Sequence, residues 1–209
     1  TISPVFFRNQ PLGCTATIIY QMYRENGVEI KKKIAGLLCS AILSDTLIFQ
    51  SPTCTSVDKE AAQELAHIVD IDIEKYAADM FAASSDLLNK TAEEIFYTDY
   101  KVFTQSEMTF CVGQITSMYR EELDKINEKM KSYIQKKHDE VAFGMTLFML
   151  TDISSKTTEL LYAGQKAEEI IKRAFNLKKL PNRVILEGVV SRKKQLIPAL
   201  MLAIQEDHM

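Results

Sequence analysis

Helical spacing of apolar residues dominates the first part of the chain. Positions 15, 18, 19, 22 and 23 share one side of a helix, and Asn26-Gly27 is the kind of pair at which a helix ends. A second stripe with the same period follows at Ile34, Leu37, Leu38, Ala41 and Ile42. Val5-Phe6-Phe7 predicts a short strand, so this part is expected to be mostly helical with little strand.

Two further helices are expected before residue 84. Ser51-Pro52 interrupts the pattern, and Thr55 with Asp58 three residues later resembles a capping box that opens a helix through about Ile68. A fourth stripe follows at Ile73, Tyr76, Ala77, Met80 and Phe81. We interpret residues 1–83 as the later half of an α/β domain whose sheet would come from preceding sequence.

Strands and helices alternate in the second part. They follow a small and polar stretch from Ala82 to Thr91, from which we predict a linker or hinge at residues 84–99. The apolar run Val141 to Leu150 is typical of a strand buried on both faces. Other strands are expected at 102–104, 109–115, 160–162 and 183–186, and helices at 117–137, 167–175 and 196–204. This order predicts a separate α/β domain with a mixed sheet over residues 100–209.

Composition narrows the class of protein. The chain has 209 residues, 46% of them hydrophobic and 25% charged, with a formal net charge of −3. This balance argues against a general nucleic-acid binder, whose footprint would be basic. No apolar run approaches the roughly 20 residues of a membrane span, and no signal peptide is recognisable. Four widely spaced cysteines favour reduced packing thiols and a cytoplasmic protein.

A basic pentapeptide, Ser191-Arg192-Lys193-Lys194-Gln195, separates a strand-like run from a helix-like run. An arginine can bind phosphate oxygens in bidentate fashion, and a lysine can add a point charge. The alternative is an ordinary solvated loop, which is the commoner fate of such triplets.

Two other segments carry candidate chemistry. Gly13 to Thr17 opens a helix after a turn, which either forms an anion site or is a simple N-cap by Thr15. Asp45 follows an apolar helix and would be costly to bury alone. It is either a hydrogen-bonded cap or a hard oxygen ligand suited to Mg²⁺ or Mn²⁺.

Three segments together carry a family resemblance. They are Gly13-Cys14-Thr15-Ala16-Thr17-Ile18, the stretch from Ala35 to Thr53 with Ser44-Asp45-Thr46 at its centre, and Gly188 to Gln195. In their order, spacing and residue identities they resemble the manganese-dependent, family II inorganic pyrophosphatases of the DHH phosphoesterase superfamily. The resemblance implies the helical latter part of a DHH domain, followed by an α/β DHH-associated C-terminal domain.

The resemblance also implies a function and roles. Complete members hydrolyse pyrophosphate with Mn²⁺ as the metal ion, and Mg²⁺ and Co²⁺ are alternatives to it. Asp45 matches a metal ligand, and Arg192 with Lys193 matches the pair that grips the phosphate that is not attacked. Domain closure at residues 84–99 and pairing of two copies are further expectations. No catalytic residue is assigned within this chain, and no nucleic acid or membrane is expected as a partner.

This chain departs from the family pattern, which limits the activity that we expect of it alone. The remaining metal ligands of the family have no counterpart here, so we expect this chain to be an inactive fragment of the enzyme. Regulatory CBS modules could be inserted upstream. The family has a lysine near the start of the strand at 109–115, where this chain reads Ser106 to Thr109 without a cation. Either that contact is lost or the alignment is shifted there, and Lys101 is a candidate substitute. Rival functions are an exopolyphosphatase or other DHH phosphoesterase, and a non-catalytic anion-binding module.

Overall fold

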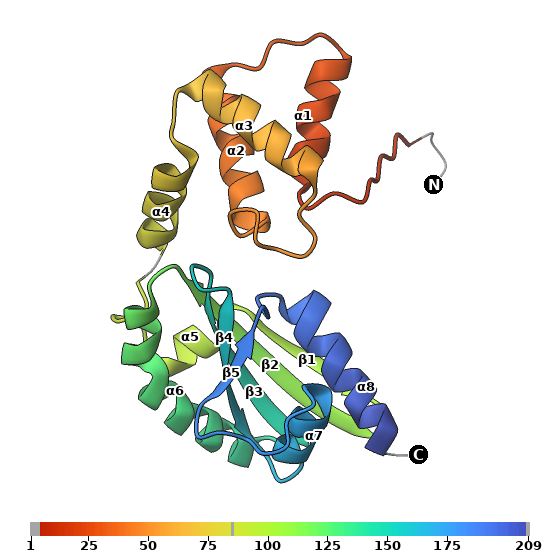
Figure 1. Cartoon of the computed structure of the whole chain (residues 1–209), viewed down its shortest axis with the longest axis vertical. Helices are drawn as coiled ribbons and strands as arrows, with labels where there is room; N and C mark the ends of the chain where they lie inside the picture. Colours follow the sequence, from red (N-terminus) through yellow and green to blue (C-terminus); the bar gives the residue numbers. More distant parts are fainter. Residues whose placement is uncertain (1–4, 85, 208–209) are drawn as a thin grey trace. The chain divides into compact units, whose positions relative to one another are not determined.

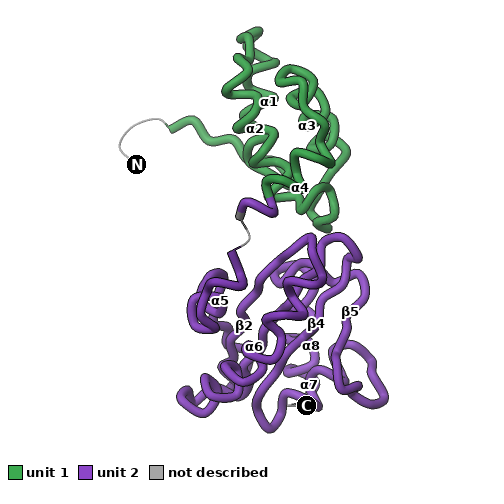
Figure 2. Tube along the Cα trace, turned by 90° about the vertical axis from the view of Figure 1, so that its left-hand side faces the viewer, with its two compact units in different colours: residues 1–80 green, residues 81–209 purple. Residues whose placement is uncertain are grey.

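The computed structural model describes residues 5–84 and 86–207, and its internal contacts divide them into two compact units, up to Met80 and from Phe81 on (Figure 2). Each unit has its own apolar core. No helix in the described part of the chain is long and apolar enough to cross a membrane.

The first unit is helical, as predicted. It contains α1 (Thr15–Glu25), α2 (Lys32–Asp45), α3 (Ser56–Val69) and α4 (Ile73–Ser84), the last of which runs past the unit boundary. Most positions of the predicted stripes lie in its core, as Ile42 does, but Ile19 and Leu37 are exposed. Leu43 and Leu65, which no predicted stripe includes, are fully buried there as well. The predicted strand at residues 5–7 is absent. That segment is extended but unpaired and exposed, because no described strand lies beside it in this unit.

The second unit is built on a five-stranded sheet in the order β1-β2-β3-β4-β5. The strands are β1 (Tyr100–Gln105), β2 (Met108–Ser117), β3 (Met145–Asp152), β4 (Thr157–Ala163) and β5 (Val184–Glu187). β2 and β3 are parallel and the other neighbours are antiparallel, which confirms the predicted mixed sheet. Every residue of β3 is buried, as its continuous apolar run predicts.

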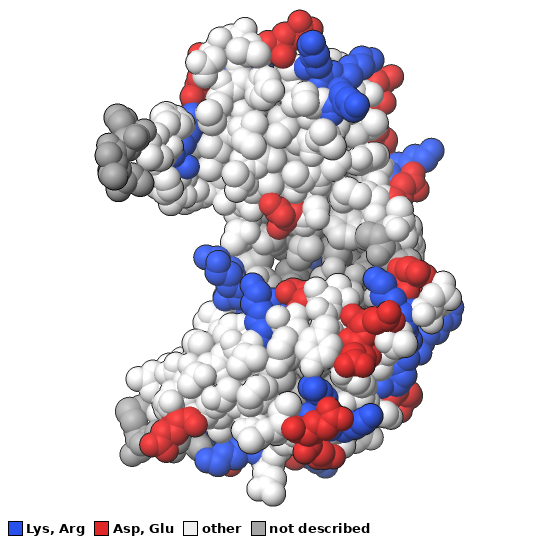
Figure 3. All heavy atoms as spheres, turned by 180° about the vertical axis from the view of Figure 1, so that it is seen from behind, with Lys and Arg blue, Asp and Glu red and all other residues white. Residues whose placement is uncertain are grey.

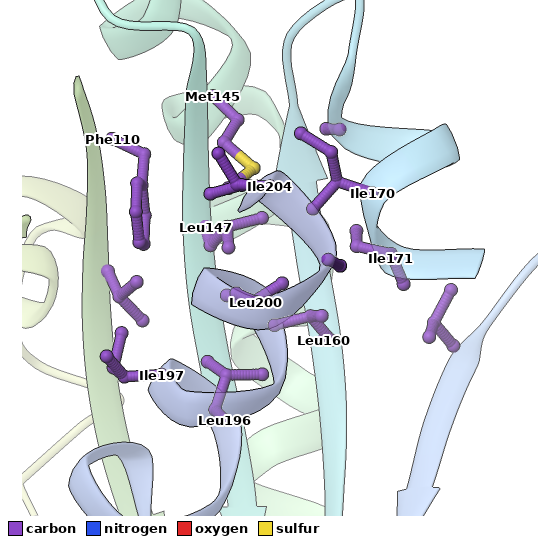
Figure 4. Close-up of a cluster of buried hydrophobic side chains, with 14 of the residues drawn as sticks. Phe110, Met145, Leu147, Leu160, Ile170, Ile171, Leu196, Ile197, Leu200 and Ile204 are labelled. Carbon is purple, nitrogen blue, oxygen red and sulfur yellow. The ribbon is translucent and has the colours of Figure 1, made fainter. Parts of the chain in front are cut away.

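Helices cover both faces of this sheet. α5 (Ala92–Thr98) and α6 (Arg120–Glu140) pack on one face, and α7 (Ala167–Ala174) and α8 (Ile197–Asp207) pack on the other (Figure 1). Along α8, Ile197, Leu200 and Ile204 point toward side chains of β2, β3 and β4 (Figure 4). The sheet core therefore fixes the start of α8, where the basic pentapeptide lies.

The predicted linker at residues 84–99 lies within the second unit, which begins at Phe81. Within residues 84–99, α5 is opened by a capping box between Thr91 and Glu94. Its Ile95 and Phe96 are fully buried in the core formed with α6. Residue 85, also within the predicted linker, lies outside the described residues. The range left for a hinge thus ends before α5, because the apolar face of that helix is committed to the sheet.

Acidic and basic side chains are interspersed on the face of the second unit that Figure 3 shows. The mixture agrees with the small net charge of the sequence. On that face the charged residues therefore form no large field of one sign.

Gly113 provides a test of this packing. A Cβ at Gly113 would lie 2.6 Å from Cδ2 of Phe148 and 3.1 Å from the carbonyl oxygen of Phe96. We expect Gly113→Ala to lower the free energy of unfolding by about 1–3 kcal/mol through overpacking. Urea denaturation of the 209-residue chain measures this change.

Gly36→Ala is the matched control. Gly36 lies within α2, and its Cβ would contact only Val69 at 3.8 Å. Alanine there should stabilise by roughly 0.5–1 kcal/mol through helix propensity. An equal response at the two glycines would contradict the assigned close approach at Gly113.

Candidate functional site

Asp45 is the last residue of α2, and its side chain is exposed. The carboxylate therefore needs no buried partner, because Asp45 lies on the outward side of the helix end. It neighbours the buried thiol of Cys14. Burial, followed by the nearby Asp45 carboxylate, raises the pKa of Cys14 to about 12. Cys14 is thus a neutral thiol beside the exposed Asp45 carboxylate.

An unusual turn follows Asp45. Leu47, Ile48 and Phe49 all have positive φ, at 50°, 53° and 64°, a conformation that costs about 1–2 kcal/mol per residue. Backbone bonds from Ile48 to Leu43 and from Ser51 to Thr46 close the turn. The buried Thr46 adds a hydroxyl that donates to the carbonyl of Ile42 and accepts from Phe49 N–H. The chain reverses sharply beside Asp45, which keeps its carboxylate at the surface.

The predicted anion site at residues 13–17 exists, but its anion is internal. The buried carboxylate of Asp58 accepts hydrogen bonds from Gly13 N–H at 2.9 Å, Cys14 N–H at 3.3 Å and Thr17 Oγ1 at 2.6 Å. It also accepts from N–H and Oγ1 of Thr55, completing the predicted capping box. The N-cap of α1 is Cys14, so the N-cap prediction for Thr15 was wrong.

Asp58 therefore joins the starts of α1 and α3 around the end of α2. A Cβ on Gly13 would lie 3.0 Å from Oδ2 of Asp58 and 3.1 Å from Cγ2 of Thr46, the residue after Asp45. Burial acts to raise the pKa of Asp58, but hydrogen bonds led by that from Thr17 outweigh it and lower the pKa. The ionised Asp58 carboxylate therefore holds the turn at Gly13 to Thr17 against the start of α3.

The residues present offer one ligand to a divalent metal rather than a complete centre. Within residues 5–84 and 86–207, no three side chains of His, Cys, Asp or Glu lie close enough to hold an ion together. Asp45 supplies a hard oxygen donor of the type Mn²⁺ accepts. His138 is instead engaged with Thr146 Oγ1, and His208 lies outside the described residues. The donor set fits part of a manganese site.

The basic pentapeptide is a braced helical turn rather than a solvated loop. Arg192–Leu196 forms a π-helical turn that leads into α8, and Ser191 caps it by accepting from Lys194 N–H. The side chain of Gln195 folds back. Its Oε1 accepts from the N–H groups of Val190 and Ser191, and its Nε2 donates to the carbonyl of Gly188.

Side chains of the sheet hold the segment that precedes the turn. Gln114 on β2 donates from Nε2 to the carbonyl of Val190 at 3.1 Å. Thr158 on β4 donates to the carbonyl of Val189 at 2.6 Å. Gly188 allows the chain to leave β5 with φ of +71°. The position of the basic residues is thus determined by the sheet.

The three cations have different environments. Arg192 is buried, with 7% of its surface exposed. Its Nη1 donates to the carbonyls of Asp99 at 2.5 Å and Val112 at 3.2 Å, and its Nη2 donates to Oδ1 of Asp99 at 2.7 Å. Lys193 and Lys194 are exposed. Arginine burial was not foreseen, because the sequence does not reveal which carbonyls lie beneath the turn.

Lys101 lies on the face of the sheet that α7 and α8 pack against. It is exposed on β1 and pairs with Val112, whose carbonyl accepts from Arg192. Side chains alternate along a strand, so Lys101 shares a face with Phe103, which packs against the core of α7 and α8. Lys101 as the substitute for the lysine missing at residues 106–109 stays a prediction. The register of the hairpin, which the sequence alone leaves open, places it on this face of the sheet.

Comparison with known proteins agrees with this picture. A DHHA2 domain model matches residues 78–203. A probable manganese-dependent inorganic pyrophosphatase of Clostridium acetobutylicum is 46% identical over 98% of this chain, and the manganese-dependent inorganic pyrophosphatase of Bacillus subtilis is 41% identical over 99%. This chain belongs to the family II inorganic pyrophosphatases.

A solved structure supports the same membership. A "putative family II inorganic pyrophosphatase" from Methanococcus jannaschii superposes with a TM-score of 0.80 and 35% identity, covering 98% of this chain and 69% of that one. This structural match confirms the predicted α/β fold class. The chain spans 66% of the length of each of the two bacterial relatives.

Loss of the Asp58 carboxylate should destabilise the first unit. Asp58→Asn replaces an ionised acceptor of several hydrogen bonds by an amide that brings donors of its own, and we expect a loss of about 2–4 kcal/mol at pH 7. Because the folded pKa is lowered, the stabilisation is present above the unfolded pKa of about 4. It is lost as the pH falls through the folded value.

Chemical denaturation of the 209-residue chain at several pH values measures both effects. The difference between wild type and Asp58→Asn should shrink on acidification below about pH 4. Glu94→Gln is the control, since Glu94 completes an exposed capping box on α5. A loss at Glu94 as large as that at Asp58 would contradict the special role of the buried carboxylate.

Proposed function

We propose that the complete protein containing this chain hydrolyses inorganic pyrophosphate to two phosphates in a manganese-dependent reaction. The observation that carries the proposal is the grouping of Arg192, Lys193 and Lys101 at one end of the sheet, with Arg192 held in a braced turn. A fixed guanidinium with neighbouring lysines suits a phosphate group that must stay bound while the other phosphate is attacked.

The chain's residues divide the work as follows. Arg192 and Lys193 would bind the phosphate that is not attacked, and Lys101 would add charge from β1. Asp45 would contribute one carboxylate oxygen to Mn²⁺, which lowers the pKa of a bound water and neutralises developing charge. The exposed position of Asp45 and the neutral thiol of Cys14 beside it support this role. The remaining ligands would come from sequence outside this chain.

Other properties of the complete protein follow from the same proposal. Domain closure at residues 84–99 stays a prediction from the family resemblance. Four cysteines without disulfide partners among the described residues favour a cytoplasmic location. Pairing of two copies stays a prediction.

The isolated 209-residue chain should be inactive. Its described residues offer a single candidate metal ligand, Asp45, which cannot assemble a metal centre by itself. Phosphate release from pyrophosphate, measured with and without Mn²⁺, should stay at the buffer rate for this chain and rise with Mn²⁺ for the complete protein. Mn²⁺-stimulated release by the isolated chain would contradict this expectation.

Substitution of the basic residues should lower kcat/KM for pyrophosphate at Lys193 but not at Lys194. In the complete protein we expect Lys193→Ala to lower kcat/KM for pyrophosphate by about 10–100-fold, and Arg192→Ala by about 100–1000-fold. Lys194→Ala, one residue away and equally exposed, should change it by less than about twofold. Equal effects at the two lysines would count against a specific phosphate contact by Lys193.

Substrate length tests the rival phosphoesterase. The complete protein should hydrolyse pyrophosphate faster than tripolyphosphate or longer polyphosphate at matched concentration of phosphoanhydride bonds. A preference for long chains would favour an exopolyphosphatase. The absence of hydrolysis of any of these substrates by the metal-loaded complete protein would favour a non-catalytic anion-binding module.

A further inference from the structure

Asp99 lies at the junction that holds the proposed phosphate-binding arginine. It caps the C-terminus of α5 and immediately precedes β1. Its carbonyl accepts from both Gln114 N–H at 3.1 Å and Arg192 Nη1 at 2.5 Å. Its carboxylate accepts from Arg192 Nη2 at 2.7 Å. One residue thus contacts the guanidinium through its backbone and its side chain.

These contacts occupy one side of the guanidinium. An arginine has five N–H donors in a planar fork. Among the described residues, two donors on Nη1 bind the carbonyls of Asp99 and Val112, and one donor on Nη2 binds the Asp99 carboxylate. The Nε–H and the second Nη2–H have no acceptor in the described structure. That pair is a fork able to bind two phosphate oxygens.

Charge explains why a carboxylate serves here. Arg192 is buried, and an unpaired buried cation would be strongly unfavourable. The Asp99 carboxylate is half exposed, with 50% of its side-chain surface accessible. It can therefore neutralise Arg192 from the surface while its own charge stays partly hydrated.

We propose that Asp99 is a positioning residue that fixes the Arg192 guanidinium so that its Nε–H and remaining Nη2–H face the phosphate. This inference rests on the proposed function, because it assigns the orientation of a residue in that site. Asp99 itself does not contact the substrate. An unfixed guanidinium would have to be ordered on binding, which weakens binding of the ground state and of the transition state.

The opposite role makes a different prediction. If Asp99 competed with phosphate for Arg192, removing its carboxylate would free the guanidinium and lower KM for pyrophosphate. Positioning predicts a higher KM and a lower kcat instead. The direction of the KM change therefore separates the two roles.

The experiment uses the complete protein with Mn²⁺ and pyrophosphate. Asp99→Ala should lower kcat/KM by about tenfold, the effect of losing one charge-assisted hydrogen bond. Asp99→Asn should stay within about threefold of wild type, because its amide oxygen can still accept from Nη2. Asp124→Ala is the matched control. Asp124 also pairs with arginines of this unit, at 2.6 Å from Arg183, but contacts no part of the turn.

A double substitution tests whether Asp99 acts through Arg192. In an Arg192→Ala background, Asp99→Ala should cause little further loss. A full tenfold loss in that background, or a lower KM for Asp99→Ala alone, would overturn the inference. If Asp99→Ala does not fold, as judged by its melting temperature, Asp99→Ser carries the same test, since its hydroxyl is too short to reach Nη2.

Failure of the inference is distinguishable from failure of the proposed function. Wild-type complete protein that does not hydrolyse pyrophosphate would overturn the proposed function, and the positioning role with it. Active wild type with an unchanged Asp99→Ala variant would overturn the positioning role alone.

Discussion

A buried charge is costly unless it is paired or hydrogen-bonded, and each unit of this chain contains such a charge beside a candidate functional segment. In the first unit the Asp58 carboxylate accepts from backbone N–H groups and hydroxyls at the starts of α1 and α3. In the second unit the Arg192 guanidinium donates to carbonyls at the end of α5 and on β2. The first is an anion that accepts hydrogen bonds, and the second is a cation that donates them. Each joins segments that are far apart in sequence.

The Asp58 carboxylate lies near a proposed functional group, and the Arg192 guanidinium is one itself. Asp58 packs on Gly13, which packs on Thr46, and Asp45 is the next residue. Asp99 holds Arg192 beside Lys193 and near Lys101. Asp45 thus lies next to a buried polar network centred on Asp58, whereas Arg192 is placed by its own hydrogen bonds to Asp99 and Val112. Such second-layer contacts preorganise a site at little cost in exposure.

Much of the fold was predictable from the sequence because it depends on local periodicity. The helical stripes of the first unit and the buried run of β3 express contacts that repeat along one element. The strand expected at residues 5–7 failed for the opposite reason, since a strand needs a partner that a short apolar run cannot specify. The capping box of Thr55 and Asp58 was predictable because its members lie three residues apart.

The site was predictable only in part. The sequence marked Gly13 to Thr17 as an anion site, but it could not show that Asp58, more than 40 residues away, supplies the anion. It marked Arg192 as a cation but not its burial against Asp99, 93 residues earlier. Lys101 depended on the register of a hairpin. The first two are non-local pairings, and the third is a strand register, none of which composition and spacing encode.

The central claim is that Arg192, fixed in its turn, presents Nε–H to a phosphate group of pyrophosphate. The most direct measurement is the ¹⁵N-arginine NMR spectrum of the complete protein, titrated with the non-hydrolysable analogue imidodiphosphate. Mg²⁺ would replace paramagnetic Mn²⁺, and loss of one signal in an Arg192→Lys variant would assign the Nε–H resonance. The account predicts a saturable downfield shift of this resonance as the analogue binds. Binding of the analogue that leaves this resonance unchanged would contradict it.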